Sequence, residues 1–290
     1  MTTVAIIGFG EAGTIFASDL ADKAQVNVWD LKFVGPERDA MLAKAEQAGV
    51  TPAASLAAAI ADAQLIFSLV TADSALALAQ EAAPHLTQRQ TFLDFNSVAP
   101  ETKRSAERAV TQRQGNYLDV AVMAPVPPAR LRTPLLLGGK EAERVAAQLR
   151  LWGCHAQALS DRVGDVSAIK MCRSVMIKGL EALTTECLTA ARRYGVEEAV
   201  LDSLHASFPS LGWHGELADY LISRVAQHGR RRSEEMREVV KTLQDVALSG
   251  TMSQAIAESQ LALVEQMAQK QIDYQMLLPF SWQQTVDKLA

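Results

Sequence analysis

A glycine-rich turn at the start of the chain constrains the fold more than any other feature. An apolar run over residues 4–7 comes first, a helical pattern over residues 14–20 comes last, and between them lie Gly8, Phe9, Gly10, Glu11, Ala12 and Gly13. In this order of strand, turn and helix, the first glycine permits a tight turn, the second lets a phosphate approach the backbone, and the third lets the helix pack on the strand. The helix N-terminus offers N–H donors to the anion. The sequence therefore predicts a dinucleotide site, with a purely steric glycine turn as the alternative.

An acidic residue after the second apolar run indicates which dinucleotide is bound. Residues 26–29 form that run, and Asp30 ends it. An acid about twenty residues beyond the first glycine accepts a hydrogen bond from a ribose 2′-hydroxyl. Because a carboxylate repels a 2′-phosphate, the sequence favours NAD, but the positive charge of Lys32 leaves NADP possible.

The first half of the chain predicts an α/β fold, a Rossmann-type doubly wound parallel sheet. From Thr2 to about Leu159, short apolar runs alternate with helical stretches, which is typical of a parallel sheet covered on both faces. Besides the two runs above, we expect strands at residues 64–70, 91–95, 117–122 and 135–137, with helices at 53–63 and 72–83. Ligands of such sheets bind at the carboxyl ends of the strands. By this rule, the candidates for ligand binding are Thr71, Asn96, Ser97 and the segment after residue 122.

The second half reads as helical throughout, so we expect an all-α domain. Residues 163–194 contain no proline and precede Gly195, a typical helix stop. At about 1.5 Å per residue this helix is more than ~40 Å long, so we expect it to join a domain of residues 1–162 to one of residues 163–290. Pro209 and Gly212 mark a break, and further helices are expected at 217–247 and 253–276. Such an extended helical domain predicts a homodimer.

One face of the expected long helix carries a polar stripe. At about 100° per residue, Ser167, Lys170, Ser174, Lys178 and Glu181 align, among apolar neighbours. A buried ammonium is costly without a partner, and a salt bridge of Lys178 with Glu181 or a snorkelling side chain is one explanation. Beside a dinucleotide, the other explanation is a general acid/base. We expect Lys170 in that role, with a pKa lowered by burial and by a positive nicotinamide.

With these features in place, the whole chain resembles the β-hydroxyacid dehydrogenase superfamily, which includes 3-hydroxyisobutyrate and 6-phosphogluconate dehydrogenases. The family's lysine motif, G-x-G-x-x-x-K-x-x-N-N, aligns with residues 164–174, where Arg173 and Ser174 replace the two asparagines. The resemblance implies that Lys170 is the acid/base and that Ser174, in place of an asparagine, contacts the substrate. The family's D-A-P-V-S-G-G stretch falls on residues 119–125, where Met123, Ala124 and Pro125 replace S-G-G. This replacement predicts a substrate other than simple 3-hydroxyisobutyrate.

More specifically, the chain resembles a branch whose C-terminal domain is labelled DUF1932. The similarity rests on residues 123–128, on 170–174 with 178–183, and on 228–231 with 235–236. Substrates of that branch are poorly defined.

Several further residues are candidates for the substrate site. Arg130, after the proline-rich turn, would clamp a carboxylate, or it is merely solvated. Asn96 and Ser97 would bind the nicotinamide or the reacting hydroxyl, or cap the helix that begins at Pro100. For His228 and Arg231 we weigh substrate contact against helix packing, because Arg231 also has Glu235 at i+4. Trp213 would line the pocket or belong to the core.

Composition excludes several classes of function. A net charge of −5 gives no general attraction for nucleic acid or anionic membranes, and no apolar stretch is long enough to cross a bilayer. The N-terminal residues already form a core strand, so we expect no signal peptide. Three widely spaced cysteines fit reduced thiols in the cytoplasm, with neither a disulfide framework nor a metal site.

Together these features predict an NAD(P)-dependent oxidoreductase that oxidises the hydroxyl of a β-hydroxy acid-like substrate or reduces the corresponding carbonyl. Hydride passes to or from the nicotinamide, and Lys170 exchanges the proton. A decarboxylating hydroxyacid dehydrogenase and an imine reductase are alternatives on the same fold. A dinucleotide-binding sensor without turnover is the alternative from another class.

Overall fold

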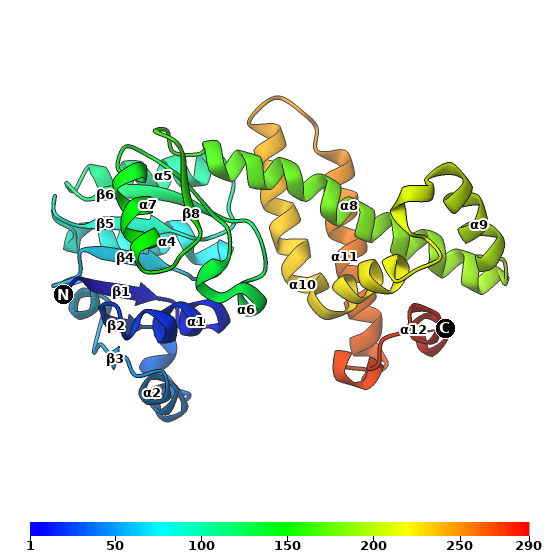
Figure 1. The fold of residues 1–290 in the computed structure, drawn as a ribbon, viewed down its shortest axis with the longest axis horizontal. Coiled ribbons are helices and arrows are strands. Elements are labelled where there is room, and N and C mark those ends of the chain that lie inside the picture. The colour runs from blue at the N-terminus through cyan, green and yellow to red at the C-terminus, as the bar shows by residue number, and fades with distance from the viewer. Residues whose placement is uncertain (290) are drawn as a thin grey trace. The chain divides into compact units, whose positions relative to one another are not determined.

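The computed structural model describes residues 1–289. The chain divides into two units, one from Met1 to Lys170 and the other from Met171 onward. The division falls inside one long helix, α8 (Asp165–Tyr194), whose first turns belong to the first unit (Figure 1).

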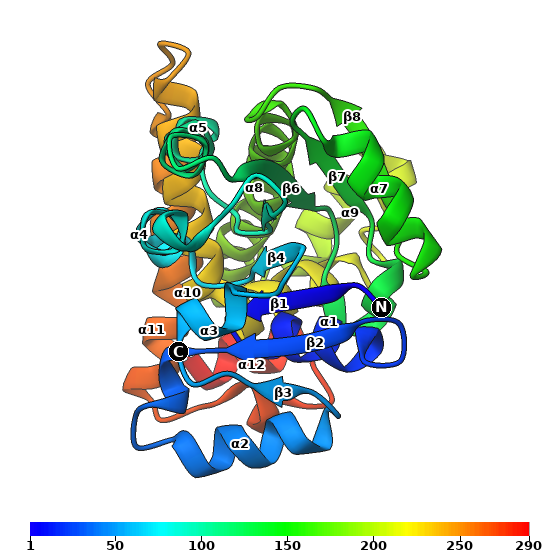
Figure 2. The same ribbon diagram turned by 90° about the vertical axis from the view of Figure 1, so that its left-hand side faces the viewer.

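The first unit is built on an eight-stranded sheet in the order β3-β2-β1-β4-β5-β6-β7-β8. Its strands are β1 (Thr3–Ile7), β2 (Gln25–Trp29), β3 (Thr51–Pro52), β4 (Leu65–Ser68), β5 (Thr91–Asp94), β6 (Asn116–Val122), β7 (Leu135–Gly138) and β8 (Ala156–Ser160). Figure 2 shows β3, β2, β1 and β4 following one another across the sheet. The order of the first six strands is that of a Rossmann fold, which confirms the expected fold class.

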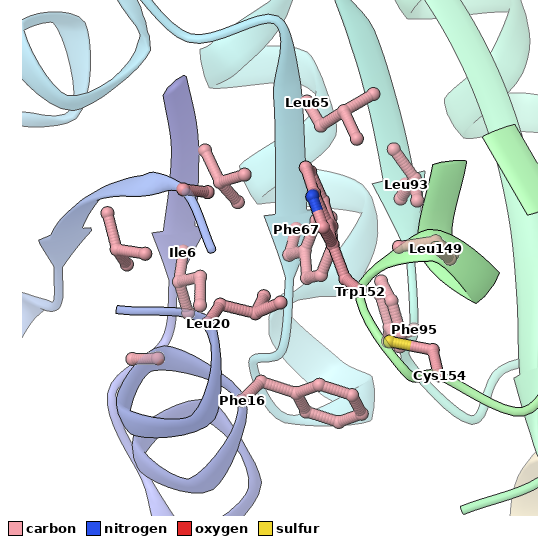
Figure 3. Close-up of a cluster of buried hydrophobic side chains, with 14 of the residues drawn as sticks. Ile6, Phe16, Leu20, Leu65, Phe67, Leu93, Phe95, Leu149, Trp152 and Cys154 are labelled. Atoms are coloured by element: carbon pink, nitrogen blue, oxygen red, sulfur yellow. The ribbon is translucent and has the colours of Figure 1, made fainter. Parts of the chain in front are cut away.

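Helices cover both faces of this sheet. One face carries α1 (Glu11–Leu20), α2 (Arg38–Gln47) and α7 (Ala142–Leu151), and the other carries α3 (Leu56–Ile60), α4 (Ala75–Ala82) and α5 (Pro100–Thr111). Figure 3 shows the core beneath the first group, where Phe16 of α1 packs beside Phe67 and Phe95. The Phe67 and Phe95 ring centroids are 4.9 Å apart. Burial of these rings fixes α1 on β1, and α1 follows the glycine turn directly.

The sheet differs from the expected one in three places. The strands β3 and β8 were not predicted, because β3 has only two residues and β8 alternates buried and exposed positions too weakly to stand out. In addition, β7 runs antiparallel to β6, whereas the other neighbouring strands are parallel. The short α6 (Val126–Ala129) and a 3₁₀ turn fill the connection between β6 and β7. A connection this short returns the chain antiparallel rather than crossing over the sheet.

The second unit is helical, as predicted. After α8 come α9 (Glu197–Ser207), α10 (Leu217–Gln244), α11 (Thr251–Gln269) and α12 (Trp282–Leu289). The long helix ends at the expected residue, since Gly195 takes a φ of +69°. The break also lies where predicted, with a 3₁₀ turn at Pro209–Leu211 and Gly212 in the left-handed region.

Two helix ends were wrong in the sequence-based prediction. The helix expected over 217–247 ends at Gln244, and the one expected over 253–276 ends at Gln269. Beyond that second end, Gln271 has a φ of +56°, and Asp273 caps a separate 3₁₀ turn by accepting a hydrogen bond from the Met276 N–H. A local cap of this kind competes with continuation of the α-helix.

The helices α10 and α11 lie side by side (Figure 1). A Cβ at Gly229 would lie 2.2 Å from the Gln260 carbonyl oxygen, so this glycine lets the two backbones approach closely. Among residues 1–289, no helix is long and apolar enough to span a membrane.

Candidate active site

The three glycines of the turn between β1 and α1 have different structural roles. Gly8 has a φ of +94°, and a Cβ there would lie 2.5 Å from the Leu69 carbonyl oxygen. A Cβ at Gly13 would lie 1.9 Å from the Gly8 carbonyl oxygen. In contrast, a Cβ at Gly10 would meet no atom within 4 Å, and the φ of Gly10 is −73°. The fold therefore requires Gly8 and Gly13, whereas Gly10 keeps open a space beside the backbone.

The N-terminus of α1 opens onto that space. Gly10 is its N-cap, and no side chain caps the helix. The first helical hydrogen bond runs from the Thr14 N–H to the Gly10 carbonyl at 3.0 Å. The N–H groups of Glu11, Ala12 and Gly13 precede this first hydrogen bond, so they have no acceptor within the helix. They lie at the positive end of the helix dipole. An open cradle with these donors fits the pyrophosphate of a dinucleotide.

Asp30 lies directly after β2 and is tied to the glycine turn. Its Oδ2 accepts from the Phe9 N–H at 2.7 Å, and its Oδ1 accepts from the Lys32 N–H at 3.0 Å. Each carboxylate oxygen has a second lone pair, so Asp30 has capacity left for a ribose hydroxyl. The Lys32 Nζ is 2.9 Å from Glu37 Oε2, and this hydrogen bond raises the pKa of the exposed Lys32. The positive charge of Lys32, which could otherwise bind a 2′-phosphate, is thus paired with Glu37.

Asn96 and Ser97 follow β5 at the same edge of the sheet, because β5 runs parallel to β4 and β4 to β1. The Asn96 amide nitrogen donates to Ser68 Oγ at 2.8 Å and to Asp94 Oδ1 at 2.7 Å. Its Oδ1 is buried and has no hydrogen-bond partner among the described residues. A buried acceptor without a partner is costly, so this oxygen fits the amide group of a bound ligand. Thr71, after β4, donates to Ser74 Oγ at 3.1 Å.

Lys170 lies next to this edge. It belongs to the first turns of α8, it is partly buried, and its Nζ donates to Ser97 Oγ. The two residues are 73 positions apart in the chain, so the fold and not the local sequence brings them together. The structure therefore places an amine beside the carboxyl end of β5, in the unit that carries the glycine turn.

The polar stripe on α8 has other partners than the expected one. Lys178 Nζ is 3.0 Å from Glu235 Oε2 of α10, and it donates to Ser174 Oγ at 3.0 Å. Glu181 accepts two hydrogen bonds from Arg232, and burial raises the pKa of its carboxyl. The suggested pair of Lys178 with Glu181 is therefore replaced by pairs between α8 and α10.

The loop after β6 is held against α1. The Met123 N–H donates to the Pro134 carbonyl at 2.9 Å, Ala124 is half-buried, and Pro125 is exposed. The Arg130 Nε donates to both Asp19 carboxylate oxygens, at 3.0 and 3.1 Å. Arg130 also has a φ of +52°, which is unusual for a residue other than glycine. Its guanidinium thus binds a carboxylate of the protein itself.

The remaining candidates lie in the second unit. Trp213 is buried in the apolar cluster with Leu188 and Ile222, although its indole N–H has no partner among the described residues. His228 of α10 is partly buried, and burial together with the charges of Arg224, Arg231 and Arg232 lowers its pKa to about 4. Arg231 pairs with Glu235 at 2.8 Å, as its i,i+4 spacing predicts.

Sequence reasoning missed a buried ionic cluster made of Asp94, Lys103, Tyr117 and Asp119. All four side chains are almost completely buried, and Lys103 Nζ lies 3.0 Å from Asp94 Oδ1 and 3.3 Å from Asp119 Oδ1. One signal was available in the sequence, since Asp94 is the last residue of the apolar strand β5 and Asp119 lies in the middle of the largely apolar strand β6. The lysine gave no such signal, because α5 is otherwise rich in charged residues.

Comparisons with known proteins identify the family. Residues 3–154 match the NAD-binding domain of 6-phosphogluconate dehydrogenase, and residues 191–263 match DUF1932, a domain of unknown function. A conserved hypothetical protein from Sinorhizobium meliloti is 38% identical, with a TM-score of 0.80 over 100% of this chain and 97% of that one.

Two further relatives support the same family. A conserved protein of unknown function, described as structurally similar to 3-hydroxyacid dehydrogenases, is 32% identical over 90% of this chain and 97% of its own, with a TM-score of 0.71. A 3-hydroxyisobutyrate dehydrogenase of Pseudomonas aeruginosa is 27% identical over 73% of this chain and 72% of its own length. The chain therefore belongs to the β-hydroxyacid dehydrogenase superfamily, with the NAD-binding domain of 6-phosphogluconate dehydrogenase and a DUF1932 domain.

Proposed function

We propose that this protein is an NAD(P)-dependent oxidoreductase that oxidises the hydroxyl of a β-hydroxy acid-like substrate or reduces the corresponding carbonyl. One observation carries the proposal. The Lys170 amine is hydrogen-bonded to Ser97 at the carboxyl edge of the same sheet that bears the open cradle at Gly10. An amine at this edge is suited to general acid/base chemistry on a ligand bound at the strand ends.

Three features of the first unit would hold the cofactor. The amides at the start of α1 would bind the pyrophosphate, Asp30 would accept from a ribose hydroxyl, and Asn96 Oδ1 would accept from the carboxamide. Thr71, which follows β4, is a further candidate for contact with the cofactor. When bound, the nicotinamide supplies the acceptor or donor of hydride.

Lys170 would exchange the proton. In the oxidative direction its neutral amine takes the hydroxyl proton as the hydride leaves, and in the reductive direction its ammonium returns that proton. Ser97 Oγ holds the Lys170 Nζ in place through their hydrogen bond. A fixed amine reacts faster than a mobile one, because its orientation is settled before the reaction.

Each unit carries candidate residues for substrate binding. We propose contacts from Met123, Ala124 and Pro125 in the first unit, and from Ser174, Trp213, His228 and Arg231 in the second. Arg130 would contact the substrate only by leaving Asp19. Because the His228 pKa is lowered to about 4, its imidazole is neutral near pH 7 and would act through hydrogen bonds.

The helical unit would also form a homodimer. In support, α8 exposes several large apolar side chains, among them Met176 at 65% and Leu183 at 59% exposed. A row of exposed apolar residues along one helix is typical of an interaction surface.

The Asp30 carboxylate predicts a preference for NAD over NADP. In the Asp30→Asn variant, we expect the ratio of the Kd for NADP to that for NAD to fall by roughly tenfold, ~1.4 kcal/mol, because the repulsion of the 2′-phosphate is lost. The asparagine oxygen still accepts from the Phe9 N–H, so the turn is preserved. Titration of intrinsic fluorescence with each cofactor measures the ratio. An unchanged ratio would show that Asp30 does not face the ribose.

A substrate screen tests the proposed function. The protein is mixed with NAD or NADP and with β-hydroxy acids, aldonates or aromatic hydroxy acids in turn. Formation of reduced nicotinamide is followed by its absorbance at about 340 nm. We expect turnover with one of these classes, and release of carbon dioxide would identify the decarboxylating reaction. Tight cofactor binding without turnover on any of them would instead support a dinucleotide sensor.

A further inference from the structure

The buried ionic cluster lies between the two segments that carry Ser97 and Lys170. Lys103 of α5 is completely buried, and its Nζ donates to the Asp94 carbonyl at 2.6 Å besides pairing with the carboxylates of Asp94 and Asp119. Tyr117 donates its hydroxyl to Asp94 Oδ2 at 2.6 Å. Burial and the neighbouring Asp94 raise the pKa of Tyr117, so the phenol stays neutral. Lys103 is therefore the ammonium that lies between two buried carboxylates.

Asp94 holds the segment after β5. Its Oδ1 accepts from the Asn96 N–H at 2.9 Å and from the Asn96 side-chain amide at 2.7 Å. Ser97, the partner of Lys170, is the next residue. The position of the Ser97 hydroxyl is thus set by a segment anchored on Asp94.

Asp119 holds the start of α8. Its Oδ2 accepts from the backbone N–H groups of Gly164 and Ser167, both at 3.2 Å, and its Oδ1 accepts from Ser167 Oγ at 2.7 Å. A carboxylate at a helix N-terminus is favoured by the helix dipole. Lys170 lies one turn beyond Ser167, on the same face of the helix. The position of the Lys170 backbone is thus set by a segment anchored on Asp119.

The cost of burying these charges indicates that the cluster does more than stabilise the fold. Burying charges costs solvation energy that their attraction only partly offsets, and apolar residues of similar volume often serve the core as well or better. An ionic cluster fixes geometry more sharply than apolar packing, because its hydrogen bonds are directional.

We propose that Lys103 is a positioning residue, which joins the Asp94 and Asp119 anchors and thereby aligns the Lys170 amine with Ser97. This inference rests on the proposed function, in which Lys170 exchanges the proton. Lys103 acts through the two anchored segments, one carrying Ser97 and the other carrying Lys170.

Two variants of the full-length chain separate positioning from stability. Lys103→Met removes the ammonium and leaves two buried carboxylates, so we expect both kcat and the melting temperature to fall. Lys103→Met combined with Asp119→Asn removes one charge of each sign. We expect its melting temperature to recover, but kcat to remain roughly 100-fold below wild type, as for an ångström-scale misplacement of a catalytic group. The KM for NAD should change much less than kcat, because among the proposed cofactor contacts only Asn96 is held by Asp94. Lys23→Met, at a half-buried lysine paired with Asp22, is the matched control and should keep wild-type kcat.

Recovery of kcat together with the melting temperature in the double variant would overturn the proposal, since the cluster would then act through stability alone. Ser167→Ala keeps every charge and removes one hydrogen bond of the Asp119 anchor, so it extends the test if the double variant does not fold. For it too we expect a lower kcat with an unchanged KM for NAD, and wild-type kcat would contradict the proposal.

A measurement without substrate distinguishes failure of this proposal from failure of the proposed function. A neutral acylating reagent modifies lysines, and mass spectrometry gives the rate at Lys170 relative to the exposed Lys140. We expect this ratio to rise in the double variant and in Ser167→Ala, because the amine is no longer held against Ser97. An unchanged ratio refutes the positioning role even if no substrate is known. Absence of wild-type turnover refutes only the proposed reaction.

Discussion

We expect the replacement of Lys170 with methionine to lower kcat by about 10²–10⁴-fold, the usual contribution of a general acid or base. Methionine keeps much of the length of lysine but carries no proton to exchange. The change removes the hydrogen bond to Ser97, which costs only about 0.5–1.5 kcal/mol of stability. Cofactor binding should stay close to wild type, because the cradle at Gly10 and the Asp30 carboxylate are untouched.

Steady-state turnover and NAD titration, made on the same preparations, check this result. Lys140→Met, at an exposed position of the same unit, is the matched control and should behave as wild type in both assays. Wild-type turnover by the Lys170→Met variant would remove the amine from the reaction. Equal loss of turnover and of cofactor binding would assign Lys170 to the binding of the cofactor instead.

Replacing Gly10 with alanine should weaken cofactor binding without unfolding the protein. The new Cβ meets no protein atom within 4 Å and the φ of −73° suits any residue, so we expect the free energy of unfolding to change by at most ~1 kcal/mol. The same Cβ would occupy the space in which the pyrophosphate approaches the α1 amides. We expect the Kd for NAD to rise at least about tenfold, ~1.4 kcal/mol.

Two other glycines make this prediction specific. Gly13→Ala places a Cβ 1.9 Å from the Gly8 carbonyl oxygen, so it should destabilise the protein itself. Gly215→Ala, in a turn of the second unit with ordinary contact at 3.4 Å, should change neither property. Calorimetric titration with NAD and thermal unfolding of the three variants give the comparison. Wild-type affinity in Gly10→Ala would mean that the phosphates do not pass this residue.

The parts of the fold set by local sequence were predictable. The strand, glycine turn and helix at residues 3–20 form a continuous segment, so their order could be inferred from spacing alone. The long helix was equally clear, because a proline-free stretch ends at Gly195. The end of α11 was missed, since the capping of Asp273 onto Met276 competes with a helical pattern that continues in the sequence.

The contacts within the candidate site depend on tertiary structure. Periodicity singled out Lys170, and the rule of strand ends singled out Ser97, but no local pattern shows that these two side chains meet. Lys103 was beyond sequence reasoning for a related reason. A lysine on a charged helix is normally solvated, and its complete burial becomes visible only when Asp94 and Asp119 are brought beside it.

The most direct test of the central claim, that Lys170 exchanges the substrate proton, is the pH dependence of kcat/KM for alcohol oxidation in the wild type and in Lys170→Met. Oxidation requires the neutral amine, so wild-type kcat/KM should fall as the pH drops and Lys170 becomes protonated. The variant should lose this ionisation and show a low, flat rate across the same range. An ionisation that persists unchanged in Lys170→Met would contradict the claim, because some other group would then be accepting the proton.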